Sequence, residues 1–184
     1  MRSSIGPLLR RSHRLAHGRL FRLKDAFLIG DHDLVPANAV VALIVVDDRC
    51  YLMQLRSQKA GIFYPGHWGL FGGAVDPGED TDTALARELR EELGAEIGNW
   101  SYFTEFTFDF SFRDLGLVWR RYYTVPLSFE RLSQLVLGEG DSMKAFTARE
   151  ALLQERVVPY DAFCIWLHAT QRRAFGSIQK RTKP

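Results

Sequence analysis

FGGAVDPGEDTDTALARELREELGA, residues 71–95, is the stretch on which the organisation of this chain depends. It holds seven carboxylates and four glycines in twenty-five positions. After the glycine-rich start, apolar residues recur at a spacing of three to four, which predicts a helix capped by Thr81 or Asp82 and ended by Gly94. Like charges three or four residues apart on a helix repel each other by roughly a few tenths of a kcal/mol per pair. Some other interaction must offset that repulsion.

Three glutamates of the predicted helix suggest what the offset is. Glu88, Glu91 and Glu92 lie at i, i+3 and i+4, so we expect their oxygens to gather on one exposed side within one turn. Hard divalent cations such as Mg²⁺ or Mn²⁺ prefer oxygen ligands and share them with water and substrate phosphates. A bound cation would turn the repulsion into attraction. For a Glu-x-x-Glu-Glu helix taken alone, a solvated surface is the competing interpretation.

The residues around these glutamates add to the pattern. Gly72-Gly73 and Pro77-Gly78 let the backbone approach a ligand closely, so a carbonyl there is a candidate metal ligand. Arg87 lies about 100° around the helix from Glu88 and cannot share its direction. We expect Arg87 to bridge to Glu79 or to a neighbouring glutamate and to orient it.

Taken in order, the fixed positions are Gly73, five residues, Glu79, seven residues, Arg87-Glu88-Leu89, one residue, Glu91-Glu92, one residue and Gly94. This spacing resembles the signature of the Nudix hydrolases, Gly-x5-Glu-x7-Arg-Glu-apolar-x-Glu-Glu-x-Gly-apolar. Every fixed position matches, and Ala95 alone is smaller than the usual aliphatic residue. The resemblance implies an α+β fold, the Nudix-type α/β/α sandwich with a mixed β-sheet.

Nudix enzymes hydrolyse a nucleoside diphosphate linked to another group, so the resemblance implies a pyrophosphohydrolase that uses Mg²⁺ or Mn²⁺. It assigns the Gly73 carbonyl, Glu88, Glu91 and Glu92 as metal ligands, with Glu79 in support. Family members take the general base from a glutamate of this motif, here Glu91 or Glu92, or from a later loop. In this chain LGEGDSMKAF, residues 137–146, offers Glu139 and Asp141, and we expect Glu139 to serve.

The substrate is less constrained than the reaction. Tyr64, Trp68 and Arg120 are our candidate substrate contacts, by ring stacking and by phosphate binding. Nucleoside triphosphates and nucleotide sugars both fit, and Phe71 stands where related enzymes commonly have proline. A nucleotide-binding regulator without strong activity and an RNA 5′-end pyrophosphohydrolase are the alternatives from other classes. The sequence itself does not indicate an oligomeric state; family members are often dimers, so the resemblance is compatible with a homodimer.

Outside residues 71–95 the pattern predicts strands and one long helix. ANAVVALIVV and CYLMQLRS flank a turn at residues 47–49, and a short strand follows at residues 70–71. An aromatic and polar alternation over residues 101–112 pairs, after a turn, with LVWRRYYTVPL at residues 117–127. Residues 128–156 predict two short helices around a strand, and a final helix runs over residues 160–173. This order indicates a layered α+β fold with mixed strand pairing.

Charge is unevenly distributed along the 184 residues. Residues 1–24 hold seven Lys or Arg and residues 172–184 hold five, both without acids, whereas residues 25–171 hold 12 basic against 22 acidic side chains. An acidic body suits cations better than nucleic acid. We divide the chain into a basic N-terminal helix and connector, residues 1–37, and a hydrolase domain, residues 38–184. A mitochondrial transit peptide is the alternative for the basic segment.

Two further features concern the protein's surroundings. Cys50 and Cys164 lie far apart without metal-ligand spacing, and we expect both to be buried thiols. No apolar run approaches the roughly 18 residues needed to cross a bilayer. We therefore expect a soluble, cytoplasmic protein with no membrane partner.

Overall fold

The structure is a computed structural model that describes residues 35–111 and 114–181, with side chains as far as residue 172. Of the predicted N-terminal helix and connector, residues 1–34 lie outside the described part. The elements in chain order are β1 (Ala39–Val46), β2 (Cys50–Leu55), β3 (Trp68–Gly69), α2 (Thr81–Leu93), β4 (Ser101–Asp109), β5 (Leu117–Leu127), α3 (Phe129–Leu132), β6 (Ser142–Thr147), α4 (Ala148–Leu152) and α5 (Pro159–Arg181).

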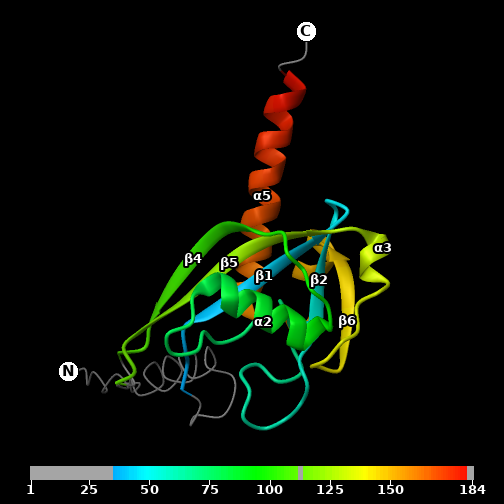
Figure 1. The fold of residues 1–184 in the computed structure, drawn as a ribbon. Coiled ribbons are helices and arrows are strands. Elements are labelled where there is room, and N and C mark those ends of the chain that lie inside the picture. Colours follow the sequence, from blue (N-terminus) through cyan, green and yellow to red (C-terminus); the bar gives the residue numbers. More distant parts are fainter. Residues whose placement is uncertain (1–34, 112–113, 182–184) are drawn as a thin grey trace, which may run out of the picture.

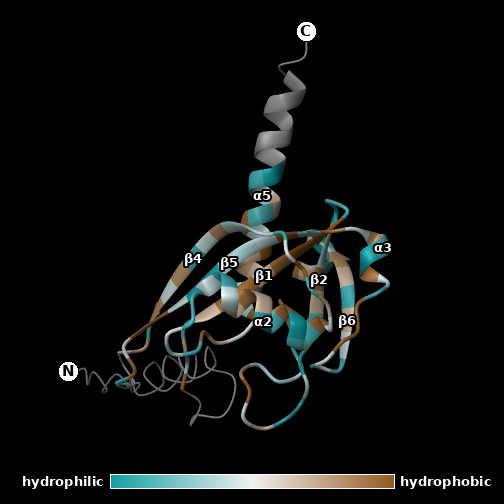
Figure 2. Cartoon of the chain, viewed as in Figure 1, coloured by the Kyte–Doolittle hydropathy of each residue, from teal (hydrophilic) through white to brown (hydrophobic). Residues whose placement is uncertain are grey.

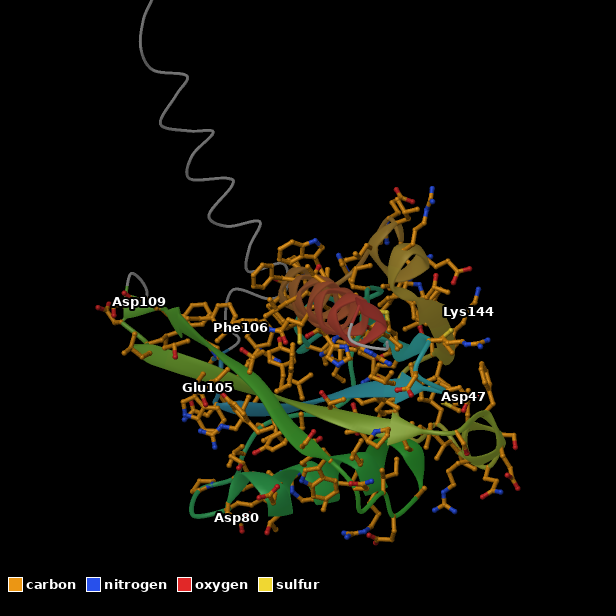
Figure 3. The ribbon with its side chains drawn as sticks, turned by 90° about the horizontal axis from the view of Figure 1, so that it is seen from above. Asp47, Asp80, Glu105, Phe106, Asp109 and Lys144 are labelled. Atoms are coloured by element: carbon orange, nitrogen blue, oxygen red, sulfur yellow. The ribbon has the colours of Figure 1, made fainter. Side chains whose placement is uncertain are left out.

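The chain folds into three layers. A six-stranded mixed sheet has the order β3-β2-β1-β5-β4, with β6 beside β2. Helix α2 covers one face and α5 the other, as Figure 3 shows from above, and the C-terminal half of α5 extends past the sheet in Figure 1. This arrangement confirms the predicted α/β/α sandwich.

Strand β1 is the centre of the core. All eight of its residues are buried, and it pairs with β5 in parallel, which explains its continuous apolar sequence (Figure 2). Alternate residues serve the two faces: Val40, Ala42 and Ile44 pack with α2, whereas Val41 and Leu43 pack with α5. The sheet therefore fixes the distance between the two helices.

A wedge between β1 and β2 receives the glycine-rich segment. These strands pair only where they join, at Val45 with Tyr51 and at Val46 with Cys50. Residues 68–74 run into the gap: β3 pairs with the far end of β2, while Phe71 bridges to Ala42 on β1. The start of the predicted metal motif is thus held in the middle of the sheet.

Most of the predicted elements are found, with differences at their ends. Both hairpins, the elements of residues 128–156 and the final helix are present, but the short strand lies at Trp68–Gly69 and α5 continues to Arg181. The cap of α2 is Asp80, whose carboxylate accepts hydrogen bonds from the Asp82 and Thr83 amides. Our assignment of Thr81 or Asp82 was wrong because the aspartate before them already satisfies the free amides.

Two other expectations can be compared with the structure. Cys164 is buried as expected, whereas Cys50 is half-buried at the start of β2, and both are free thiols. Within residues 35–181, none of the helices combines the length and the apolar character that a membrane span requires.

Candidate active site

Glu92 lies on the face of α2 that packs against the sheet. Only 5% of its surface is exposed, and it shares its stripe with the buried Leu85 and Leu89. The expectation that Glu92 is exposed is therefore wrong. The three-residue step from Leu89 to Glu92 places both on one side of the helix, so the carboxylate is carried inward with the leucines.

Two donors hold the buried carboxylate. The Gln54 amide donates from Nε2 to Glu92 Oε1 at 2.6 Å, and the Gly72 backbone N–H donates to Oε2 at 2.6 Å. Burial raises the pKa of Glu92 to about 7, because desolvation outweighs both hydrogen bonds and the charges of Glu88 and Glu139 add to it. Glu92 is thus a fixed carboxylate that gains from any nearby positive charge.

This raised pKa gives Glu92→Gln a pH-dependent effect on stability. A group whose pKa is raised on folding contributes stability below its unfolded pKa and loses it as pH rises through the folded value. Between pH 4.5 and 7.5, the metal-free wild type should therefore lose up to about 3 kcal/mol relative to Glu92→Gln. Urea unfolding of both proteins in EDTA measures the difference. A difference that stays constant over this range would contradict the buried, charged state.

Gln54 is a residue of the candidate site that the sequence analysis missed. It is buried on β2, and its side chain binds Glu92 across 38 positions of sequence. The available signal was a single amide among the apolar residues of CYLMQL, since buried polar groups normally have a partner.

Removing this amide should leave Glu92 without one of its donors. We expect Gln54→Leu to lower the free energy of unfolding by about 1–3 kcal/mol, because a buried acceptor loses its hydrogen bond. Urea titration measures the loss. Gln154→Leu is the matched control: its amide donates to the Glu150 carbonyl in an exposed bond, so its effect should stay within about 0.5 kcal/mol. Equal effects of the two variants would contradict this role for Gln54.

Arg87 of α2 connects this helix to the preceding loop, which carries Ala74 and Glu79. Its guanidinium donates to both Glu79 oxygens at 3.0 and 2.9 Å, to the Ala74 carbonyl at 2.9 Å and to Glu88 Oε1 at 2.7 Å. Glu91 Oε2 lies farther away, at 3.5 Å. The hydrogen bonds from Arg87, together with the Asp76 backbone N–H, lower the pKa of Glu79. The predicted bridge from Arg87 to Glu79 is therefore present.

Glu88 lies against the backbone of Gly73. A Cβ added at Gly73 would be 2.5 Å from the Glu88 carboxylate, so any side chain there would displace it. Burial raises the pKa of Glu88, and the contact with Arg87 opposes the shift. The Gly73 carbonyl accepts the Val40 N–H at 3.0 Å, which leaves one lone pair toward other ligands.

Glu139 lies in the same cleft as Glu92. The loop that carries it is fixed to the end of α2, where the Gly138 N–H donates to the Glu92 carbonyl at 2.8 Å. The cleft has a volume of about 400 Å³. Its lining residues are Gln54, Arg56, Ser57, Lys59, Ile62, Glu92, Gly138, Glu139 and Gly140. The structure thus brings the later-loop glutamate to the acidic helix.

The cleft also has a basic side that the sequence analysis missed. Arg56 and Lys59 come from the loop after β2, and the Arg56 side chain donates to the Phe63 carbonyl at 2.8 Å, which folds this loop back on itself. Two cations ahead of the glycine-rich segment were the available signal. Positive groups opposite carboxylates suit a ligand that carries both a metal and phosphates.

The three predicted metal ligands do not converge in this structure. In the part of the chain that the structure describes, no three Asp, Glu, His or Cys side chains form a metal-ligand group. Glu92 points into the sheet, Glu88 pairs with Arg87, and Glu91 is exposed. Glu88 and Glu91 share Arg87 as a donor, whereas Glu92 is held by Gln54 and Gly72. The donor chemistry nevertheless fits Mg²⁺: every candidate ligand is an oxygen, and the pKa values of Glu88 and Glu92 are raised.

An aromatic cavity of about 610 Å³ lies on the α5 side of the sheet. Its lining residues are Pro36, Ala37, Phe63, Tyr64, Phe106, Thr107, Phe108, Asp109, Phe110, Val118, Arg120, Pro159, Tyr160 and Phe163. Tyr64 and Arg120, two of the predicted substrate contacts, are thus together. Trp68 is not among them, because it is half-buried and packs edge to face on the core residue Phe146.

Neighbouring arginines of β5 serve opposite faces, as strand geometry requires. Arg120 stacks over Tyr160 of α5, with its guanidinium carbon 4.4 Å from the ring centroid. Arg121 pairs with Glu105 at 2.8 Å on the side of α2. Figure 3 shows the same alternation in β4, where Glu105 and Phe106 leave the strand on opposite sides. Only Arg120 therefore belongs to the aromatic cavity.

Comparison with known proteins places this geometry in a family. The model of the NUDIX domain matches residues 35–167. Among curated proteins, the nucleoside triphosphatase NudI of Salmonella arizonae is 45% identical over 60 residues, which are 33% of this chain and 42% of that protein. The match therefore spans less than half the length of this relative.

Solved structures show the same fold at low sequence identity. A MutT protein from Methanosarcina mazei superposes with a TM-score of 0.62 at 19% identity, covering 77% of this chain and 99% of the other. The E. coli ORF135 protein gives a TM-score of 0.59 at 24% identity, covering 77% and 94%. These matches span nearly the whole of the two solved structures and about three quarters of this chain.

Proposed function

Since this chain belongs to the NUDIX family, we propose that it is a divalent-metal-dependent pyrophosphohydrolase that acts on nucleoside triphosphates. The observation that carries the proposal is the cleft in which Glu92, held by Gln54 and Gly72, shares its walls with Glu139 and Lys59. The similarity to a nucleoside triphosphatase over 60 residues supports this substrate class over nucleotide sugars.

We assign the metal to Glu88, Glu91, Glu92 and the Gly73 carbonyl. When bound, divalent ions neutralise the charge of a phosphate chain and lower the pKa of a bound water. Glu91 is exposed and Glu92 is buried between two donors, so the ligand set combines a solvent-accessible and a preorganised carboxylate. Arg87 orients Glu88 and holds Glu79 in support, as its hydrogen bonds allow.

The chain's own residues perform the remaining tasks. Glu139 is exposed at the edge of the cleft and is our candidate for accepting a proton from the attacking water. Lys59 and Arg56 line the same cleft and bind the phosphates as charge partners. The cavity beside Tyr64 offers flat apolar walls to the base.

Retention of every carboxylate favours an enzyme over a regulator that only binds nucleotides. A binding module does not need a buried glutamate with a dedicated amide donor at the metal cleft, because burying a carboxylate is costly. The alternative of RNA 5′-end processing depends on the basic terminal segments, and residues 1–34 of these lie outside the described part.

Purified protein incubated with Mg²⁺ and a panel of nucleoside triphosphates, nucleotide sugars and dinucleotides tests the proposal. Phosphate and pyrophosphate release should be fastest with nucleoside triphosphates. The matched control is Glu92→Gln, which should release both products on the order of 10³-fold more slowly. Faster turnover of nucleotide sugars would show that they, and not nucleoside triphosphates, are the substrate class. If no compound were hydrolysed, the nucleotide-binding regulator would be the remaining interpretation.

A further inference from the structure

Among the described residues, Arg120 presents its guanidinium to the aromatic cavity without a hydrogen-bonding partner. Arg120 stacks on Tyr160 at 4.4 Å, and within residues 35–111 and 114–172 its side chain has no hydrogen bond or ion pair. The buried Asp161 is close enough to attract it electrostatically, but no hydrogen bond joins the two side chains: the Asp161 oxygens accept the Leu70 N–H at 2.9 Å and the Tyr122 hydroxyl at 3.2 Å. Arg120 is only partly buried, so its N–H groups stay available to water or to a ligand in the cavity.

The surroundings of Arg120 indicate what kind of ligand these N–H groups meet. The cavity walls are largely phenylalanine and tyrosine rings, which suit a flat aromatic ring and give a phosphate chain nothing to bind. Asp109, the one carboxylate of the lining, accepts the Ser111 N–H and lies at the tip of the β4 strand in Figure 3. Phosphates have their own partners in the other cleft, at Arg56 and Lys59.

The backbone of Arg120 lies near the glycine-rich segment that carries Gly73. Arg120 is the register partner of Ala39, and Ala39 bridges to Ala74, next to Gly73. Two strand spacings put the Arg120 backbone roughly 10 Å from this segment. The loop after β2 connects the two sites as well, since Lys59 and Ile62 line the cleft while Phe63 and Tyr64 line the cavity.

We propose that Arg120 selects the base of the nucleotide, favouring bases that present a carbonyl oxygen over bases that present an amino group. Guanine, uracil and thymine offer such an oxygen, whereas adenine and cytosine offer an amino group at the corresponding position. Arginine only donates hydrogen bonds, so an amino group opposite it leaves both groups unpaired. This inference rests on the proposed function, whose substrate it specifies.

Nucleotide binding and turnover test the inference separately. Calorimetry of the full chain should show GMP and UMP binding about 10- to 100-fold more tightly than AMP and CMP, the range expected for one unsatisfied buried donor. With Mg²⁺, kcat/KM for GTP and UTP should exceed that for ATP and CTP by a similar factor. Arg120→Gln, whose amide both donates and accepts, should reduce each ratio to about threefold or less.

Arg121→Gln is the matched control, because it removes the neighbouring arginine on the opposite face of the sheet. It should leave the ratios unchanged. Circular dichroism checks folding; should Arg120→Gln fail to fold, Arg120→Met decides, since it keeps an unbranched stem over Tyr160, has no N–H donor and should therefore also reduce the ratios.

The outcomes separate the two proposals. Equal binding and equal kcat/KM for the four bases would overturn the role of Arg120 and leave the hydrolase intact. Preserved ratios in a folded Arg120 variant would overturn it as well. No hydrolysis of any triphosphate would overturn the proposed function, and the binding order of the monophosphates would still decide the inference.

Discussion

Glu92→Gln is expected to lower kcat for nucleoside triphosphates on the order of 10³-fold, with the fold retained. The substitution removes a charge from the proposed metal ligands, and metal stabilisation of developing charge amounts to several kcal/mol, roughly tenfold in rate for each 1.4 kcal/mol. The fold should survive because glutamine fills the same volume and relieves the desolvation that raises the pKa of Glu92. Steady-state kinetics with saturating Mg²⁺ measure the loss.

The control for Glu92→Gln is a glutamate that lies outside the cleft. Glu96 pairs with Arg90 at 2.6 Å in an exposed contact, so Glu96→Gln should keep kcat within about twofold. Circular dichroism of both variants separates loss of chemistry from loss of fold. A folded Glu92→Gln enzyme with near wild-type kcat would remove Glu92 from the metal site.

Chelation of divalent metal should abolish turnover, and added Mg²⁺ should restore it. The proposed ligands are carboxylates, which repel a phosphate chain unless a divalent cation lies between them. We expect EDTA to reduce kcat by on the order of 10³-fold or more, since the electrostatic contribution of the metal is lost. Phosphate release measured before and after addition of excess Mg²⁺ gives the two values.

Thermal unfolding supplies a second measurement of metal binding that does not depend on turnover. A ligand that binds only the folded chain at about 100 times its Kd adds about 2.7 kcal/mol of stability. Wild type should therefore unfold at a higher temperature with Mg²⁺, and Glu88→Gln should show a smaller increase. Full activity in EDTA, with no change in unfolding temperature, would contradict a metal-dependent mechanism.

Local sequence pattern was sufficient to predict most helices and strands and the order of the candidate site residues along the chain. The helix over Thr81–Leu93 follows from apolar spacing and from the ending glycine, which adopts φ 62° at Gly94. The hairpins follow from apolar alternation around turns. Each of these signals lies within a few residues of the element that it predicts.

Local sequence pattern could not predict that the Glu92 side chain points toward the sheet. Spacing alone put Glu88, Glu91 and Glu92 on one exposed side, and the structure separates them. Which side of a helix is buried depends on the sheet it packs against, and Gln54, the partner of Glu92, is 38 positions away. The helix stripe ends in a glutamate here because the sheet presents an amide and a backbone N–H at that point.

By itself, the sequence determined the family motif, the layered α+β class and the residues that form the acidic helix, because helix periodicity, capping and turn formation depend on neighbouring residues. Only the tertiary structure decided that Glu92 is buried, that Glu139 and Lys59 meet it in one cleft, and that Arg120 enters an aromatic cavity. Those relations join residues far apart in the chain, such as Leu70 and Asp161 at a separation of 91, and packing of the sheet against two helices sets them.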